Sequence, residues 1–309
     1  DIEFSMAAIS EAKNACRNGD LNEDVFQEEL SKRKDMRDLD IITIDGPHSK
    51  DLDDAISIEK NEKGNYILGV HIADVSHYVK EDSALDHESF DRGNSIYLLD
   101  YVVPMLPKEL SNGICSLNEG EDRLTLSCIM EVNEEGVVLN HEISETIIRS
   151  KGRLVYDDVS DYLESLSNPT SHIEGDKTDS EDWDLNDFGN AAEHEKTLLL
   201  MQELAILLQK KRHEDGSLDF DLDEAEIEVD EQGVPREIVS IDRRIANRMI
   251  EEFMLLANKT VAEEDFWMNY PFVYRIHEKP DPDSIMKLKS FMAGLGLKLS
   301  VNADNVHPK

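Results

Sequence analysis

The fold of this chain is decided by the stretch Ile41-Ile42-Thr43-Ile44-Asp45-Gly46-Pro47-His48-Ser49-Lys50-Asp51-Leu52-Asp53-Asp54-Ala55-Ile56-Ser57-Ile58. An apolar, β-prone run ends at Asp45, and a Gly-Pro turn follows it. A second run of alternating apolar residues begins at Ala55. The pattern predicts a strand, a loop and a second strand. This arrangement places four carboxylates at one edge of a sheet, where the strands end: Asp45, Asp51, Asp53 and Asp54.

Four carboxylates this close in sequence repel one another, and they do so more strongly where water is partly excluded. We therefore expect a cation to neutralise them. Oxygen ligands of this kind suit Mg²⁺ or Mn²⁺, which proteins often hold with a few carboxylates together with substrate phosphates. Lys50 lies among the acids as a partner for a phosphate group.

Two other interpretations compete with a catalytic metal site. An Asp-rich loop is most often a solvated turn. A calcium loop of the EF-hand type requires Gly at its sixth position, where counting from Asp51 gives Ile56. The position of the acids between two predicted strands, after a defined turn, favours the catalytic interpretation.

The pattern of acids from Asp45 to Ala55 resembles the catalytic signature of the ribonuclease II/ribonuclease R family, whose catalytic unit is the RNB domain. Other blocks that resemble the family follow in order, over about residues 40 to 300. They are 70–79, 92–97, 104–107, 110–117, 122–124, 250–258 and 274–278. Their residues are closer to ribonuclease R than to ribonuclease II.

This resemblance implies a 3′-to-5′ hydrolytic exoribonuclease that releases nucleoside 5′-monophosphates from single-stranded RNA and depends on Mg²⁺. It assigns Mg²⁺ to Asp45, Asp51 and Asp54, and it makes Asp53 the most critical acid, which assists the attacking water. Tyr97 matches an aromatic residue that stacks on a base near the RNA 3′ end.

Three further residues are candidates for RNA contact. Tyr156 resembles a family aromatic near the active site, and Lys50 lies within the acidic loop. Arg153 closes an alternation of cations at 149, 151 and 153, which lines either an RNA channel or a solvated strand face. The position of a second clamping aromatic in some relatives carries Ile227 here, which leaves Tyr97 as the better stacking candidate.

The charge of the chain conflicts with RNA binding. It has 32 basic and 68 acidic residues and a net charge of −36, whereas nucleic-acid binders usually carry the opposite sign. Either the acids cluster away from the RNA, or basic flanking modules supply the attraction. The charge also favours an alternative function, a catalytically incomplete RNB-like RNA-binding or interaction fragment. A third option, a Mg²⁺ phosphohydrolase acting on small phosphoesters, fits the acids but not the other blocks.

The periodicity predicts an α+β fold with a mixed, largely antiparallel sheet flanked by helices. We expect a helical lead-in over residues 1–39 and an RNB catalytic domain over 40–309, with an acidic insertion loop at about 166–190. The resemblance implies that this domain is incomplete at its C-terminus. It also implies flanking OB-type RNA-binding domains and a later arginine-rich segment in the full-length parent.

Shorter elements follow from local signals. We expect a hairpin at about 124–148, a helix of about 20 residues that ends at 210–213, a second long helix over 243–264, a strand at 274–277, and a last helix capped by Asp281. His71, Asp74 and His77 are expected to be polar groups satisfied at a strand end, with metal binding as the alternative.

The sequence also gives an expectation for the cellular location of the protein. It has no run of 18 apolar residues, and its start lacks the basic region of a signal peptide. Its three cysteines are scattered and lack metal-ligand spacing. We therefore expect a cytoplasmic protein with no membrane partner and with cysteines that act as small buried apolar residues.

Overall fold

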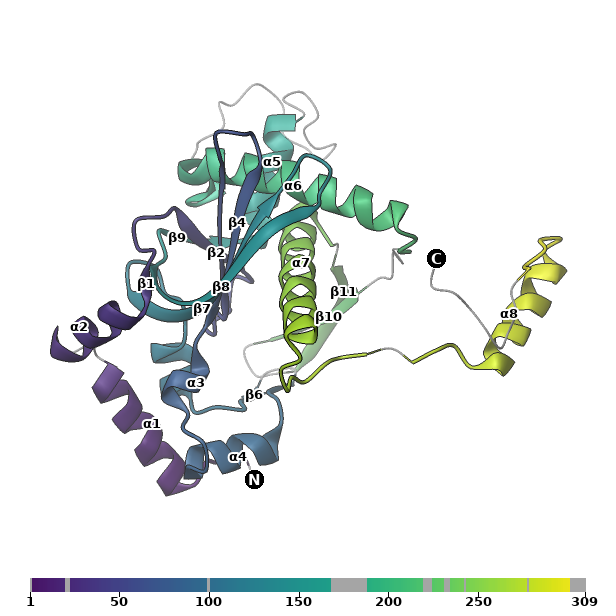
Figure 1. Ribbon diagram of the computed structural model, residues 1–309. Helices are drawn as coiled ribbons and strands as arrows, with labels where there is room; N and C mark the ends of the chain where they lie inside the picture. Colours follow the sequence, from purple (N-terminus) through teal and green to yellow (C-terminus); the bar gives the residue numbers. More distant parts are fainter. Residues whose placement is uncertain are drawn as a thin grey trace, which may run out of the picture.

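The computed structural model describes residues 2–19, 23–98, 101–167, 188–218, 224–230, 234–241, 243–276 and 278–300. Its centre is a seven-stranded sheet with the strand order β1-β8-β7-β4-β3-β2-β9 (Figure 1). These strands are β1 (Lys34–Asp35), β2 (Ile41–Asp45), β3 (Asp54–Lys60), β4 (Tyr66–Ala73), β7 (Asp122–Val132), β8 (Val138–Arg149) and β9 (Gly152–Val155). β1 pairs with β8 and β2 with β9 in parallel, and the other neighbours are antiparallel. The predicted α+β fold is confirmed.

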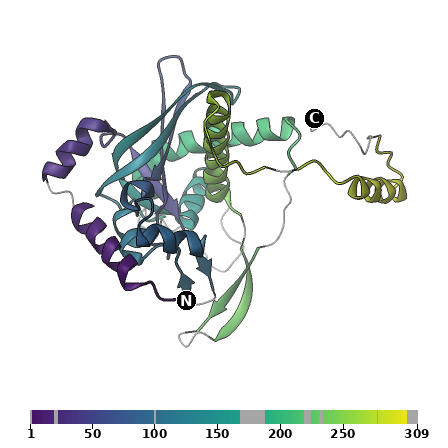
Figure 2. The ribbon, with the colours of Figure 1, turned by 60° about the horizontal axis from the view of Figure 1, so that its bottom comes forward.

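Two small sheets and several helices surround this sheet. The small sheets pair β5 (Ile96–Tyr97) with β6 (Val102–Val103), and β10 (Glu224–Val229) with β11 (Pro235–Ile241). The helices are α1 (Met6–Gly19), α2 (Glu23–Lys32), α3 (Val75–Tyr78), α4 (Ala84–Arg92), α5 (Tyr156–Ser167), α6 (Glu195–Glu214), α7 (Ile245–Met268) and α8 (Pro282–Gly294), with short turns η1 (Leu110–Ile114) and η3 (Ala191–His194). Figures 1 and 2 both show α8 lying apart from the rest of the chain.

The two faces of the large sheet bury separate hydrophobic cores. One core packs Ile56, Ile58 and their neighbours against α5, α6 and α7. The other contains Ala55 and Leu52 and is covered by α1 and by residues around η1. This division follows from the period of a strand, because successive side chains point to opposite faces. The acidic loop between β2 and β3 is therefore anchored through Leu52, which is 1% exposed.

Most of the local predictions are confirmed. The predicted hairpin is formed by β7 and β8, and the two long predicted helices are α6 and α7, the latter running to Met268. α8 begins as expected, since the side chain of Asp281 accepts a hydrogen bond from the amide of Ser284 and Pro282 occupies the first turn. Among the described residues, no helix is long and apolar enough to cross a membrane.

Other predictions need correction or fall outside the described residues. The strand expected at 274–277 is wrong for residues 274–276, which are exposed and belong to no sheet, and residue 277 is not described. Exposed backbone without a neighbouring strand lacks the hydrogen bonds that define one. Of the acidic insertion loop predicted at about 166–190, residues 168–187 lie outside the described residues. Phe188 is buried against Tyr162, with ring centroids 5.5 Å apart. The domain boundary expected at residue 39 stays a prediction.

Candidate active site

The acids lie where β2 and β3 separate. These strands pair through Ile41 with Ser57 and Ile42 with Ile56, so Asp45 at the end of β2 and Asp54 at the start of β3 lie beyond the paired residues. The connecting loop, residues 46–53, carries Asp51 and Asp53 and is the acidic loop. Asp53 is the most exposed of the four acids, and the other three are half-buried.

The acids lie close enough to influence one another electrostatically. Burial, followed by the charges of Asp54 and Asp53, raises the pKa of Asp45 to about 7, and the nearby Arg153 opposes this rise. Loss of surrounding water and then the charge of Asp53 raise the pKa of Asp54. Loss of surrounding water and then the charge of Asp51 raise the pKa of Asp53. The site therefore concentrates negative charge that its own cations offset only in part.

The donor chemistry of these acids fits a hard divalent cation, because carboxylate oxygens that repel one another are stabilised by a shared positive charge. Geometry is a separate matter: among the described residues, no group of three or more His, Cys, Asp or Glu side chains is arranged to hold a metal ion. Binding of Mg²⁺ by Asp45, Asp51 and Asp54 therefore stays a prediction.

A groove with a volume of about 900 Å³ opens beside the acidic loop. Its walls come from the loop, from the β5–β6 ribbon, from the segment before and within η1, and from the first turns of α5 and α7. Its lining residues include Lys50, Asp51, Tyr97, Tyr101, Lys108, Asn112, Tyr156, Asp157 and Asn247. Lysines and acids are equally numerous in this lining, whereas acids outnumber bases about two to one in the whole chain. That the acids of the chain cluster away from the RNA stays a prediction.

Both predicted aromatic residues line the groove. The ring of Tyr97 is accessible, since the residue is 66% exposed, and its hydroxyl donates a hydrogen bond to Oδ2 of Asp51 at 3.0 Å. Burial, then the charges of Asp45 and Asp54, raise the pKa of Tyr156 to about 12, so its hydroxyl stays protonated near the acids. Both side chains combine an aromatic face with a proton donor.

Arg153 contacts the acidic loop. Its Nη2 donates to the carbonyl oxygens of Ser49 at 2.7 Å and Pro47 at 3.4 Å. The guanidinium thus fixes the loop from the β9 side and lies outside the lining of the groove, which includes Lys50. The basic alternation that includes Arg149 does not form one strand face, because Arg149 ends β8 and pairs with Asp122 at 2.6 Å. Direct contact of Arg153 with RNA stays a prediction.

His71 near the end of β4 and Asp74 directly after it are satisfied internally, as expected. His71 is buried between the hydroxyls of Ser57 and Ser127, at 3.0 and 2.7 Å. Asp74 pairs with the buried Arg33 at 2.7 Å. These groups serve the fold and do not extend the site.

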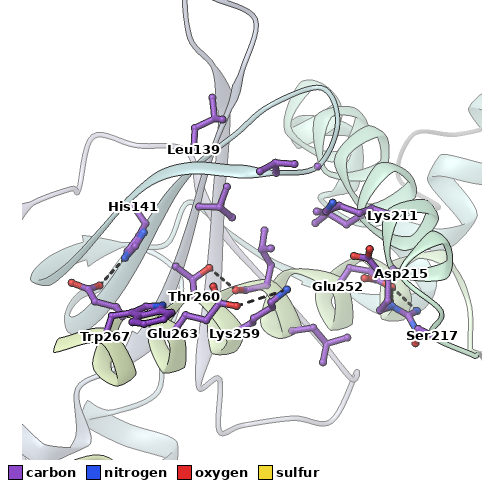
Figure 3. Close-up of a pocket in the computed structure, with 18 residues that line it drawn as sticks. Leu139, His141, Lys211, Asp215, Ser217, Glu252, Lys259, Thr260, Glu263 and Trp267 are labelled. Carbon is purple, nitrogen blue, oxygen red and sulfur yellow. Dashed lines mark hydrogen bonds and ion pairs between the residues drawn. The ribbon is translucent and has the colours of Figure 1, made fainter. Parts of the chain in front are cut away.

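A second cavity, of about 630 Å³, lies between the β7–β8 hairpin, the end of α6 and the face of α7 (Figure 3). Its polar groups pair with one another: Arg212 with the buried Glu252 at 2.7 Å, and His141 with Glu264 at 2.9 Å. Glu252 therefore packs in this second cavity and does not line the groove, and Glu251 pairs with Arg243.

Several residues of the groove were not predicted. Lys108, Asn112 and Asn247 line it. Ser116 does not line the groove, but its hydroxyl forms hydrogen bonds with the backbone of the acidic loop. Asn112 and Ser116 belong to the block 110–117 that resembles the family, so their position in that block was the available signal.

An α+β domain that places clustered carboxylates beside an open groove with accessible tyrosines is a candidate metal-dependent nuclease. Comparison with known proteins identifies the family: residues 33–308 match the RNB domain, and the chain belongs to this family. Ribonuclease R of Thermotoga maritima is 46% identical over 286 residues, which are 92% of this chain and 37% of that protein. Ribonuclease R 1 of Lactococcus lactis is 45% identical over 93% of this chain and 33% of that protein.

The solved structures agree. Mycoplasma genitalium RNase R in complex with ribose-methylated single-stranded RNA superposes with a TM-score of 0.81 at 32% identity, covering 99% of this chain and 44% of that one. The resemblance to the RNB domain and to ribonuclease R is thereby confirmed. The chain spans only about a third of the length of the curated relatives that it matches.

Proposed function

We propose that this chain carries the catalytic site of a 3′-to-5′ exoribonuclease, which hydrolyses single-stranded RNA and releases nucleoside 5′-monophosphates. The observation that carries the proposal is the groove in which Asp51, Lys50 and Tyr97 meet beside the other three acids. Family membership and the RNA bound to the M. genitalium relative support RNA as the substrate.

The residues have separable tasks in this reaction. In hydrolysis, the oxygen of a water molecule forms a bond to the phosphorus of the scissile phosphate. The bond between this phosphorus and O3′ of the preceding nucleotide breaks, and O3′ takes up a proton as it leaves. Asp53, the most exposed of the four acids, accepts a hydrogen bond from the attacking water and orients it. Tyr97 offers its accessible ring to the terminal base, and Lys50 offers its charge to a phosphate.

Asp45, Asp51 and Asp54 are the residues that we assign to Mg²⁺ or Mn²⁺. When bound, such an ion neutralises charge at the scissile phosphate and lowers the pKa of water. The support is the donor set itself, since clustered carboxylates on a loop held by the surrounding structure are stabilised by a cation.

A second function is favoured by the net charge of −36, since nucleic-acid enzymes usually carry the opposite sign. Under this function the chain is a catalytically incomplete fragment that binds RNA or another partner. Under either function, flanking OB-type RNA-binding domains and a cytoplasmic location remain proposals.

The decisive experiment follows 5′-labelled single-stranded RNA on a gel, with Mg²⁺ and with EDTA. We expect products that shorten from the 3′ end in Mg²⁺ and no shortening in EDTA. Asp53→Asn should lower the rate at least about 100-fold and leave RNA binding largely intact, because the amide keeps the shape but loses the charge.

Asp82→Asn is the matched control. Asp82 has an exposed side chain on a turn with φ of 61°, a conformation that Asn also adopts readily. It should cleave at the wild-type rate. Undiminished cleavage by Asp53→Asn would refute the catalytic assignment, and RNA binding without cleavage by the wild type would favour the second function.

A further inference from the structure

The acidic loop is held in place by residues far away in sequence. On one side, Arg153 donates to the carbonyls of Pro47 and Ser49. On the other, backbone amides bind its last residues: Leu117 donates to the carbonyl of Leu52 at 2.9 Å, and Ala73 to that of Asp53 at 3.0 Å. These contacts fix the two ends of the loop. The peptide groups on either side of Asp51 form their hydrogen bonds with a different residue.

That residue is Ser116. Its hydroxyl donates to the carbonyl oxygen of Lys50 at 2.9 Å and accepts from the amide of Leu52 at 3.2 Å. One side chain therefore binds the backbone immediately before and immediately after Asp51. A serine hydroxyl has one proton and two lone pairs, so it can make both bonds at once. Oδ1 of Asn118, at 3.3 Å, is a second and longer acceptor for the same proton.

Burial makes these bonds effective. Ser116 is 0% exposed and Leu52 is 1% exposed, so solvent cannot replace the hydroxyl. Loss of one partner would leave a buried amide without its hydrogen bond, which destabilises the local structure.

Ser116 is itself rigidly placed. Nε of Arg123, a residue only 9% exposed, donates to the carbonyl of Ser116 at 2.7 Å. The amide of Ser116 donates to the carbonyl of Gly113 at 3.1 Å, at the end of η1. A chain of buried contacts thus runs from Arg123 on β7 through Ser116 to the acidic loop.

We propose that Ser116 is a positioning residue of the active site, whose hydroxyl sets the backbone of Asp51 and so the place of its carboxylate beside Tyr97. The inference rests on the proposed function. Ser116 lies under the loop and does not line the groove, so it acts on the reaction only through Asp51. Displacement of a catalytic group by about 1 Å is enough to slow a reaction about 100-fold.

The test compares Ser116→Ala with Ser89→Ala. Ser89 is also buried and also donates through its hydroxyl to a backbone carbonyl, that of Leu85 within α4, away from the groove. Ser116→Cys is a second variant that keeps the shape of serine but is a weaker hydrogen-bonding group, so that a folded protein is available even if the alanine variant does not fold.

Two readouts are needed for each variant. Deuterium exchange, followed by mass spectrometry on a peptide that contains residues 47–53, reports the protection of the Leu52 amide without any need for activity. Single-turnover cleavage at saturating RNA, with RNA affinity measured in EDTA, separates catalysis from binding.

We expect Ser116→Ala to exchange about 10-fold faster in this peptide and to cleave about 10- to 100-fold more slowly, with unchanged RNA affinity. Ser116→Cys should be intermediate, and Ser89→Ala should match the wild type in both readouts. Unchanged exchange, or faster exchange with a wild-type cleavage rate, would overturn the proposal. A wild-type protein that does not cleave RNA would refute the proposed function instead, and the exchange readout would then decide the positioning role alone.

Discussion

At Tyr97, one side chain offers two different interactions to the site. Its ring is exposed to the groove, while its hydroxyl donates to Asp51 at 3.0 Å. The pKa of Tyr97 is raised by partial burial and by this hydrogen bond, so the hydroxyl remains a donor at neutral pH. Stacking on a base and orientation of Asp51 are therefore separable by substitution.

We predict that Tyr97→Phe keeps RNA affinity, because the ring is retained, but cleaves about 10-fold more slowly at saturating RNA, because a hydrogen bond to a charged group is lost. Tyr97→Ala should also lower RNA affinity, by about 1–3 kcal/mol. Fluorescence anisotropy in EDTA and single-turnover cleavage measure the two effects. Tyr270→Phe, an exposed tyrosine outside the lining of the groove, is the control. Equal rates for Tyr97→Phe and wild type would mean that the hydroxyl has no role in the reaction.

Among the elements, four neighbouring strands share a buried row of polar side chains. Ser57 on β3 bonds His71 on β4, which bonds Ser127 on β7, which in turn bonds Thr146 on β8 at 2.5 Å. The row leaves no room for a side chain at Gly69, where an added Cβ would lie 2.4 Å from Oγ of Ser57. These bonds join β3, which carries Asp54, to the middle of the sheet.

The row predicts a pH dependence of stability. Burial lowers the pKa of His71 to about 3 from an ordinary value of 6.5. Between these values the unfolded chain binds a proton that the folded chain excludes, so the contribution of His71 is complete above pH 6.5 and is lost as the pH falls toward 3. At pH 5 the loss is about 2 kcal/mol.

Urea unfolding at pH 7.5, 6 and 5 measures this effect. His71→Gln removes the titrating group, so its free energy of unfolding should fall less than that of the wild type as the pH is lowered. Between pH 7.5 and pH 5 the two losses should differ by about 2 kcal/mol. His87→Gln, whose histidine side chain is 69% exposed, serves as the control and should follow the wild-type slope. Parallel slopes for His71→Gln and wild type would contradict a neutral buried histidine.

For the molecule as a whole, charge is the dominant property. A net charge of −36 makes the folded chain repel itself, while the groove lining holds lysines and acids in equal number. Salt screens both the self-repulsion and the attraction of the lysines for phosphate, so stability and RNA binding should respond to salt in opposite directions.

We predict that raising NaCl from about 50 to 500 mM increases the melting temperature by about 2–4 °C, which corresponds to about 1 kcal/mol for a domain of this class. Over the same range RNA affinity should fall about 10- to 30-fold, as expected when Lys50 and Lys108 each neutralise one phosphate. Differential scanning fluorimetry and anisotropy measure the two responses, and KCl run in parallel separates ionic strength from specific ion effects. A melting temperature that falls with salt would contradict the dominance of self-repulsion.

The sequence by itself determined the kinds of elements and the candidate acids. Apolar alternation predicted a strand that ends at Asp45 and another that begins beside Asp54. Asp281 marked the start of a helix, and an Asp-rich loop between strands indicated the site. These features depend on residues close together in the chain, since backbone periodicity and capping act over a few positions. Resemblance then predicted the family, which the comparisons confirmed.

Only the tertiary structure decided which distant residues meet. Ser116 bonds Leu52 across 64 positions, and Arg153 bonds the carbonyl of Ser49 across 104. Neither partner follows from local pattern, because both depend on the strand order that places β9 beside β2 and on the packing of η1 beneath the loop. The same reason explains the wrong strand at 274–276: the side chains suit a strand, but a strand exists only where a neighbour completes its hydrogen bonds.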